Sequence, residues 1–216
     1  MKFDRSMLLL YAVTDRTWTG KMTLEQQVEA ALQGGVTMVQ LREKELGDGD
    51  FLEEAVKMRS LTKAYHVPLI INDSIKIALA CDADGVHVGQ GDMEAGKARS
   101  LIGPDKILGV TAKTVEQAVL AEKNGADYLG VGAVFGSKTK KDAVPMTVER
   151  LKAIAGAVSI PIVAIGGISG ENVLELKGSG IAGAAVVSGI FAAGDIRAAA
   201  LNLLGKIKIV TGQGEG

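Results

Sequence analysis

The sequence predicts a single-domain (β/α)8 (TIM) barrel, an α/β fold in which eight parallel strands alternate with helices. Eight short runs of apolar or β-branched residues recur along the chain, and helical stretches separate them. Most of these runs are apolar throughout, as expected for parallel strands that are covered on both faces. A chain of 216 residues is long enough for one such domain and too short for two of ordinary size.

The competing architecture is a doubly wound open sheet, which carries a glycine-rich turn after its first strand. Here the first apolar run ends at Val13 and continues as Thr14, Asp15 and Arg16. The turn therefore lacks the glycines of a dinucleotide site, and the number of strand–helix units favours the barrel.

The apolar runs place the strands in chain order. We expect strands at residues 8–13, 38–41, 69–72, 85–88, 107–110, 128–131, 162–165 and 184–187. Helices are expected at residues 23–32, 51–64, 114–123, 147–155 and 196–204. Two of these helices open with capping-box spacing, Thr23 with Gln26 and Thr114 with Gln117. The catalytic domain is thus expected to be residues 1–205, and the polar residues 206–216 are expected to fray.

Composition and charge argue against several classes of protein. The net charge of −1 argues against a nucleic-acid binder, which usually carries a basic excess. Cys81 is the single cysteine, so the chain has no intramolecular disulfide, and we expect a buried apolar side chain. The apolar run at residues 8–13 is too short to span a bilayer, and glycines interrupt residues 178–194. We expect a cytoplasmic protein without membrane contact; the oligomeric state, a homo-oligomer included, stays open.

Polar and charged residues directly follow the predicted strands. Because the carboxyl ends of barrel strands converge on one rim, where active sites are built, these side chains are expected to meet there. They are Gln40, Arg42 and Lys44 after the second strand, Asn72 and Asp73 after the third, Asp92 after the fourth, Lys140 after the sixth, Gly166 and Gly167 after the seventh, and Ser188 after the eighth.

Asp73 and Asp92 follow neighbouring strands and are predicted to face each other. Two carboxylates with an amide, and without His or Cys, form a hard oxygen site suited to Mg2+ and a substrate phosphate. The alternative is helix capping, because each aspartate precedes a helical stretch and Asp is a good N-cap. The sequence leaves both interpretations open.

Arg42, Lys44 and Lys140 bring positive charge to the same rim. Beside an acidic metal site they predict a diphosphate ligand, whose oxygens Mg2+ and cations neutralise together. The alternative for the lysines is a solvated basic surface.

Gly167 and Ser188 predict a second anion site. Barrels commonly bind phosphate through backbone amides in the loops after the seventh and eighth strands, where glycine allows a close approach. A purely structural glycine turn is the alternative. Two anion sites of different character indicate two phosphorylated small-molecule substrates.

The two histidines do not form a catalytic set with serine and aspartate. His66 is expected to be exposed at a helix end. His87 lies inside a predicted strand, where packing or support of the site is expected rather than direct catalysis.

Eight segments, from the first predicted strand to the eighth, carry a family resemblance. They read YAVTD at residues 11–15, VQLREK at 39–44, IINDS at 70–74, ADGVHVGQGD at 83–92, GADYLGVGAVF at 125–135, TKKD at 139–142, AIGGI at 164–168 and VVSGI at 186–190. The QLREK, IND and GQGD set in this order is specific, whereas AIGGI occurs in many phosphate-binding barrels. On these segments the chain resembles the thiamin-phosphate synthase family.

The resemblance implies a transferase with a role for each matching residue. Gln40, Arg42, Lys44, Asn72, Thr111 and Lys140 would bind 4-amino-2-methyl-5-hydroxymethylpyrimidine diphosphate, and Asp73 with Asp92 would hold its Mg2+. Ser137, Thr139, Gly167, Val187 and Ser188 would bind the thiazole phosphate. The implied reaction ionises the pyrimidine carbon–oxygen bond, with Arg42, Lys44 and Lys140 stabilising the leaving diphosphate. The thiazole nitrogen then captures the cation, which gives thiamin phosphate.

Three positions depart from the family pattern. Residues 111–113 read Thr-Ala-Lys where Ser-x-His is usual, so the hydroxyl is kept and the imidazole is not. Gly136 stands where proline is usual, and Pro145 lacks the glycine that often follows it. These departures bear on substrate positioning rather than on the reaction class.

Two rival functions share parts of this pattern. Thiazole tautomerase relatives share the barrel and the phosphate site but generally lack the acidic pair. A catalytically silent phosphate-binding barrel would keep Gly167 and Ser188 but has no need for the charged set Arg42, Lys44, Asp92 and Lys140.

Overall fold

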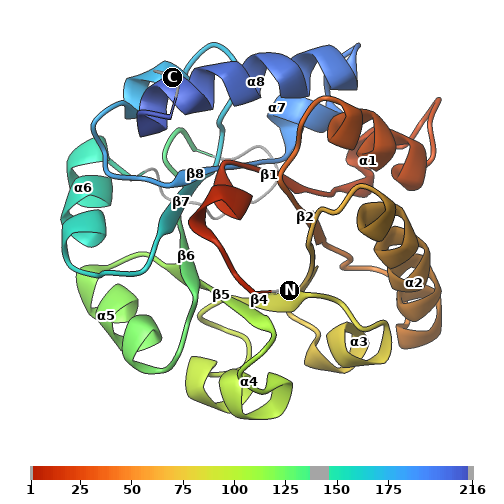
Figure 1. Cartoon of the computed structure of the whole chain (residues 1–216), viewed down its shortest axis with the longest axis horizontal. Helices are drawn as coiled ribbons and strands as arrows, with labels where there is room; N and C mark the ends of the chain where they lie inside the picture. Colours follow the sequence, from red (N-terminus) through yellow and green to blue (C-terminus); the bar gives the residue numbers. More distant parts are fainter. Residues whose placement is uncertain (1, 137–145, 214–216) are drawn as a thin grey trace.

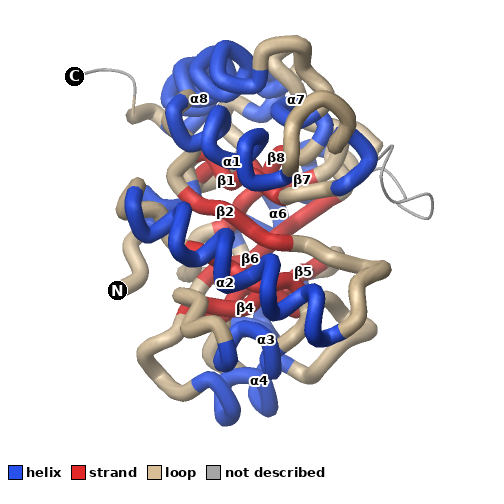
Figure 2. Tube along the Cα trace, turned by 90° about the vertical axis from the view of Figure 1, so that its right-hand side faces the viewer, coloured by secondary structure: helices blue, strands red, loops and turns tan. Residues whose placement is uncertain are grey.

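The computed structural model describes residues 2–136 and 146–213 and confirms the predicted barrel. Eight parallel strands close into a ring in chain order, and β1 pairs with both β2 and β8. Figure 1 shows the helices arranged around this ring, and Figure 2 shows from the side that the strands lie inside them. The closed ring leaves no free sheet edge.

Short buried strands and amphipathic helices alternate along the chain. The strands are β1 (Leu10–Val13), β2 (Met38–Leu41), β3 (Leu69–Asn72), β4 (Gly85–Val88), β5 (Ile107–Ala112), β6 (Tyr128–Gly132), β7 (Ile162–Ile165) and β8 (Gly183–Val186). The helices are α1 (Leu24–Gln33), α2 (Asp48–Ala64), α3 (Ile75–Ala80), α4 (Ala95–Ile102), α5 (Val115–Lys123), α6 (Val148–Gly156), α7 (Ser188–Phe191) and α8 (Ile196–Thr211). Three 3-10 turns complete the order: η1 (Arg5–Leu8), η2 (Arg16–Trp18) and η3 (Val173–Leu176).

The predicted capping boxes are present in full at α1 and in part at α5. At α1, Thr23 accepts a hydrogen bond from the Gln26 amide, and the Gln26 side chain accepts one from the Thr23 amide. At α5, Thr114 accepts from the Gln117 amide, but the Gln117 side chain accepts from the amide of Lys113 instead. Both hydroxyls therefore cap their helices as expected.

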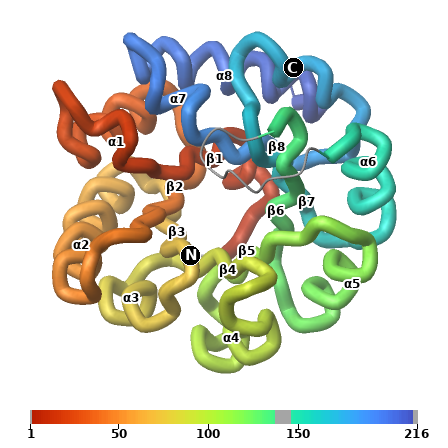
Figure 3. The backbone as a smooth tube through the Cα atoms, turned by 180° about the vertical axis from the view of Figure 1, so that it is seen from behind, coloured from red at the N-terminus to blue at the C-terminus, as the bar shows by residue number. Residues whose placement is uncertain are grey.

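The C-terminal helix is longer than the sequence suggested. The chain was expected to fray after Gly205, yet α8 continues to Thr211. Ile207 is fully buried and Val210 is buried as well, so this last part of the helix covers the barrel instead of extending into solvent. Figure 3 shows α8 lying beside α1, which brings the first and last helices of the barrel together.

The interior of the barrel forms a layer of its own, separate from the packing between strands and helices. Tyr11 and Tyr128 are its largest fully buried side chains. Phe3 stacks on the Tyr128 ring with centroids 6.1 Å apart, and Met7 packs beside it. The N-terminal segment thus closes the amino-terminal end of the barrel, across which it lies in Figure 1. Active-site space is left at the opposite end.

Ion pairs tie the amino-terminal ends of the strands to the helices. The Asp84 carboxylate, just before β4, accepts from the Leu69 amide at 2.8 Å and from Arg59 Nη1 at 2.7 Å. Asp127, just before β6, repeats this arrangement with the Leu108 amide at 2.7 Å and Arg99 Nη2 at 2.6 Å.

Within residues 2–136 and 146–213, no helix is both long enough and apolar enough to cross a bilayer.

Candidate active site

A cavity of about 580 Å³ opens at the carboxyl ends of the strands. The predicted site residues that the structure describes all line it: Gln40, Arg42, Lys44, Asn72, Asp73, Asp92, Thr111, Gly167, Val187 and Ser188. Ser137, Thr139 and Lys140 lie outside the described residues. Side chains from strands far apart in sequence therefore meet in one cavity, as the barrel predicts.

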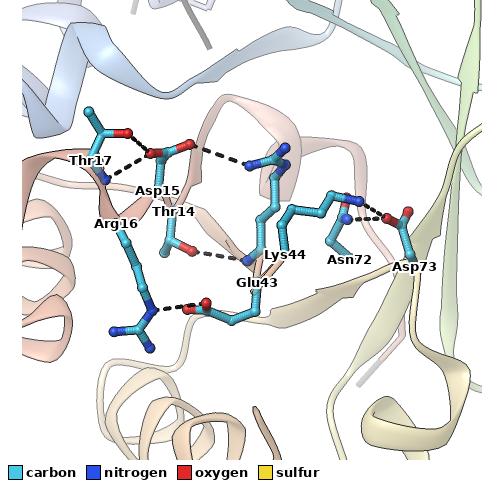
Figure 4. A network of polar contacts seen from close by, with 9 residues as sticks. Thr14, Asp15, Arg16, Thr17, Glu43, Lys44, Asn72 and Asp73 are labelled. Carbon is cyan, nitrogen blue, oxygen red and sulfur yellow. Dashed lines mark hydrogen bonds and ion pairs between the residues drawn. The ribbon is translucent and has the colours of Figure 1, made fainter. Parts of the chain in front are cut away.

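Asp73 is the centre of a polar cluster on the rim. Lys44 Nζ lies 2.5 Å from Asp73 Oδ2, and Asn72 Nδ2 donates to the same oxygen at 2.6 Å. Figure 4 shows Lys44 and Asn72 approaching the Asp73 carboxylate from one side. The backbone of Asp73 has a φ of 62°, in the left-handed region, and its amide donates to the carbonyl of His87 at 2.8 Å.

Neither aspartate of the predicted metal pair caps a helix. The N-cap of α3 is Ser74, whose side chain accepts from the Ile77 amide. The N-cap of α4 is Glu94. Asp92 instead accepts from the Gly89 amide at 2.8 Å and lines the cavity, as Asp73 does. The capping interpretation is therefore wrong at both positions.

The two carboxylates lie close enough to affect each other. Partial burial raises the pKa of the Asp92 carboxyl above its usual range, and hydrogen-bonding proximity to Asp73 raises it further. Such a pair favours a bound cation, which offsets the repulsion between the two charges.

This donor set fits Mg2+ better than a metal held by the protein alone. Among residues 2–136 and 146–213 there is no group of three or more His, Cys, Asp or Glu side chains placed to hold an ion. Mg2+ typically takes one or two carboxylates together with waters and substrate phosphates. Asp73 and Asp92 are the residues that could hold it.

Arg42 is held beside the cavity by the loop that follows β1. Its amide donates to Thr14 Oγ1 at 3.0 Å, and its Nη1 lies 3.3 Å from Asp15 Oδ2. The next side chain, Glu43, points the other way and is only 3% exposed, where it pairs with Arg16 at 2.9 Å. Figure 4 shows the Arg16–Glu43 pair apart from the contacts of Asp15. Glu43 is thus anchored outside the cavity that Arg42 and Lys44 line.

The glycines after β7 are required by the backbone itself. Gly166 and Gly167 have φ values of 101° and 67°, which glycine adopts readily. A Cβ on Gly166 would lie 2.4 Å from Ala133 Cβ, and one on Gly167 would lie 2.6 Å from the Phe135 carbonyl oxygen. The loops after β6 and β7 therefore pack backbone to backbone, so the structural-turn interpretation holds whether or not an anion binds there.

A buried hydrogen-bond chain crosses the floor of the cavity. Gln40 Nε2 donates to the Tyr11 hydroxyl at 2.7 Å, which lies 2.8 Å from the Tyr128 hydroxyl. His87 Nδ1 lies 3.1 Å from the Tyr128 hydroxyl, and His87 Nε2 lies 2.9 Å from Thr111 Oγ1. The chain connects β2, β1, β6, β4 and β5 in that order, with a predicted site residue at each end.

Several cavity residues were not singled out from the sequence. Tyr11 and Asp15 lie in the YAVTD segment, but an apolar run does not by itself show which face of the strand turns to the barrel interior. Lys113, noted only as a departure, lines the cavity too. Strand alternation could have placed Tyr11 on the side of Val13, which also lines the cavity.

Comparisons with known proteins identify the family of the chain. Residues 10–190 match the family model described as thiamine monophosphate synthase. The thiamine-phosphate synthase of Ruminiclostridium cellulolyticum is 53% identical over 195 residues, which cover 90% of this chain and 93% of that protein. The one from Clostridium acetobutylicum is 52% identical over 188 residues, covering 87% and 89%.

The solved structures give the same result at the level of the fold. A thiamine phosphate pyrophosphorylase from Pyrococcus furiosus superposes with a TM-score of 0.88 at 38% identity, covering 95% of this chain and 98% of that one. The structure of KGPDC from Streptococcus mutans, at a TM-score of 0.64 and 14% identity, shows the shared barrel alone. By the match over residues 10–190 and by relatives at about half identity, the chain belongs to the thiamine monophosphate synthase family.

Proposed function

We propose that the chain is a Mg-dependent thiamin-phosphate synthase, which joins hydroxymethylpyrimidine diphosphate to a thiazole phosphate with release of diphosphate. The observation that carries this proposal is one cavity lined by Arg42, Lys44, Asp73 and Asp92, with Gly167 and Ser188 on its wall. The charged side of this cavity suits a substrate that loses diphosphate, and the side with Gly167 and Ser188 suits a second substrate that carries a phosphate.

The acidic side of the cavity is proposed to take the diphosphate with its metal. Asp73 and Asp92 would hold Mg2+, which when bound supplies positive charge to the diphosphate oxygens. Lys44 now neutralises Asp73 and is well placed to turn to a substrate oxygen instead. Arg42, whose contact with Asp15 is long at 3.3 Å, can present its other donors to the same anion.

The protein's part in the reaction is electrostatic. Loss of diphosphate leaves negative charge on the departing oxygen, and Arg42 and Lys44 hold cations fixed beside it. Lys140 is proposed to join them, and it lies outside the described residues. The pyrimidine would lie on the floor beside Gln40, Asn72 and Thr111, and the thiazole nitrogen attacks with its own lone pair. No protein nucleophile or base is required.

The other side of the cavity is proposed to take the thiazole phosphate. Gly167, Val187 and Ser188 line it, and Asn172 Nδ2 donates to the Gly167 carbonyl at 2.9 Å, which fixes the turn. Ser137 and Thr139 are proposed to complete this site.

A direct assay tests the proposal. The purified protein should release diphosphate and form thiamin phosphate only with both substrates and Mg2+, and chelation should stop both. Conversion of the thiazole alone would favour the tautomerase activity of related barrels. Binding of both substrates without turnover at any Mg2+ concentration would favour a silent phosphate-binding barrel.

A further inference from the structure

The hydrogen-bond chain through Tyr11, Tyr128 and His87 is more elaborate than packing requires. Two strand glycines make room for it: a Cβ on Gly109 would lie 2.2 Å from Tyr128 Cζ, and one on Gly130 would lie 3.0 Å from His87 Cε1. Glycine weakens a strand, so its presence at two positions around one polar pair indicates that the pair itself matters.

The chain has a direction because each hydroxyl carries only one proton. Burial raises the pKa of both tyrosine hydroxyls, Tyr11 and Tyr128, so each stays protonated. With Gln40 Nε2 as the donor, the Tyr11 hydroxyl accepts there, and its own proton can point to Tyr128. In that arrangement the proton of Tyr128 points to Nδ1 of His87, 3.1 Å away.

The hydrogen-bond chain continues from His87 to Thr111 at the rim of the cavity. In the same arrangement His87 accepts at Nδ1 and carries a proton on Nε2, which faces Thr111 Oγ1 at 2.9 Å. Thr111 then accepts from His87, and its own proton is left for a partner in the cavity that it lines. At the other end, Gln40 has used an amide proton inward, so its Oε1 atom remains as an acceptor.

We propose that this chain is a positioning device, in which Tyr11 and Tyr128 hold His87 as the Nε2–H tautomer and so present Thr111 to the substrate as a hydrogen-bond donor and Gln40 as an acceptor. A donor at Thr111 suits an anionic diphosphate oxygen, and an acceptor at Gln40 suits the amino group of the pyrimidine. The reversed chain would turn a lone pair of Thr111 toward the anion. The identity of these substrate groups rests on the proposed function; the direction of the chain does not.

The tautomer can be read without any activity. The sequence has two histidines, so 15N-histidine labelling gives two imidazole spin systems, and a His66→Gln variant assigns them. In the free protein at neutral pH, His87 should show a proton on Nε2 and an unprotonated Nδ1. A proton on Nδ1, an imidazolium, or an even mixture of tautomers would overturn the proposal.

Tyr128→Phe removes the middle hydroxyl and keeps the ring. The His87 tautomers should then mix, and the KM for the pyrimidine diphosphate should rise roughly tenfold, as for one lost hydrogen bond to a charged group. The KM for the thiazole phosphate should not change. Tyr65→Phe is the matched control, because the hydroxyl of Tyr65 lies at the surface beside Glu29 and takes no part in the hydrogen-bond chain. A raised KM with an unchanged His87 tautomer would show a packing role only.

Thr111 provides a second test at the rim, which does not depend on how Tyr128→Phe folds. Thr111→Val should raise the same KM and shift the His87 Nε2 resonance, and Thr111→Ser should restore both. Equal KM values for the valine and serine variants would contradict the proposal. If His87 has the expected tautomer but thiamin phosphate is never formed, the proposed function is wrong, and the proposed direction of the hydrogen-bond chain is still supported.

Discussion

The backbone conformation of Asp73 determines whether its carboxylate lines the cavity or caps a helix. Its left-handed φ of 62° is uncommon for a residue with a side chain, although aspartate tolerates it better than most. The conformation places its carboxylate beside Lys44 and Asn72 and leaves capping of α3 to Ser74. Strain of this kind is found most often at functional sites. The sequence could not distinguish cap from ligand, because the difference is a shift of one residue.

Asp92→Asn tests the metal ligand. The change keeps the shape of the side chain and removes its charge, so turnover should fall by about a hundredfold or more, the loss expected when several kcal/mol of charge stabilisation disappears. Steady-state assays across a Mg2+ titration measure this. Near-normal turnover with an unchanged Mg2+ requirement would mean that Asp92 does not bind the metal.

The same variant has an expected effect on stability. The pKa of Asp92 is raised in the folded protein, so its ionisation opposes folding once the pH exceeds the ordinary aspartate value of about 4. Without Mg2+, Asp92→Asn should therefore be at least as stable as the wild type at pH 7, and its advantage should vanish toward about pH 4. Urea unfolding at the two pH values checks the sign.

Lys113 replaces the histidine usual in the family, and it lines the cavity. The proposed reaction needs no proton removed from the thiazole nitrogen, so a base at this position is unnecessary. Lys113→Ala should cost at most about 2 kcal/mol, or less than roughly thirtyfold in turnover, and Lys113→His should be tolerated. Turnover from pH 6 to 9 with both substrates saturating is the measurement. A thousandfold loss rescued by histidine only above its pKa would restore a general-base role.

At the scale of elements, the strands were the easiest to predict and the helix ends the hardest. The apolar runs placed each strand within two residues, because burial on both faces leaves little choice of residue. The apolar run predicts one strand from residue 8, but Asp4 caps a 3-10 turn that ends at Leu8, and β1 begins only at Leu10. A full helix is replaced by the turn η3 between β7 and β8.

The end of α8 was missed for a physical reason. Gly205 and the polar residues after it suggested fraying, whereas the spacing of Ile196, Ala200, Leu203, Ile207 and Val210 keeps one apolar face to the end. What stabilises the helix here is contact with the barrel rather than local propensity, which a local reading of composition does not detect.

Two isoleucines of α8 give a matched test of this contact. Ile207 is fully buried and Ile209 is 51% exposed. Ile207→Ala should lower the free energy of unfolding by about 2–5 kcal/mol. Ile209→Ala should change it by no more than about 0.5 kcal/mol. Chemical denaturation of both variants decides the point, and equal effects would mean that the last turns of α8 are not docked in solution.

At the scale of the molecule, the amino-terminal end of the barrel holds stabilising ion pairs, and the carboxyl end holds the candidate active site. The amino-terminal end carries satisfied ion pairs, and Arg99 there also donates to the carbonyls of Gly103, Lys106 and Gly125. The carboxyl end carries the strained Asp73 and the paired carboxylates. Among the described residues, the sequence predicted that the polar side chains following the strands gather at the carboxyl end, because all strands of a parallel barrel end on one rim. It could not predict the tyrosine–histidine chain, which depends on which way buried side chains turn.

This division predicts that Arg99 affects stability without affecting the reaction. Arg99→Ala should lower the free energy of unfolding by roughly 2–4 kcal/mol, because several hydrogen bonds to carbonyls and to Asp127 are lost together. KM and turnover at 25 °C should stay near normal. Lys97→Ala, an exposed change on the same helix, is the control. A large change in KM would mean that the two ends are coupled.

Closure of the ring between β1 and β8 has a consequence for the nascent chain. β1 is synthesised well before β8, which is its second partner in the ring. Until β8 is made, one edge of β1 has no partner and offers its backbone to any extended segment nearby. Gly34 at the end of α1 fits against Ala200 of α8, so the final helix locks onto the first. The barrel cannot close before β8 and α8 have been made, and until then the growing polypeptide is open to misassociation along β1.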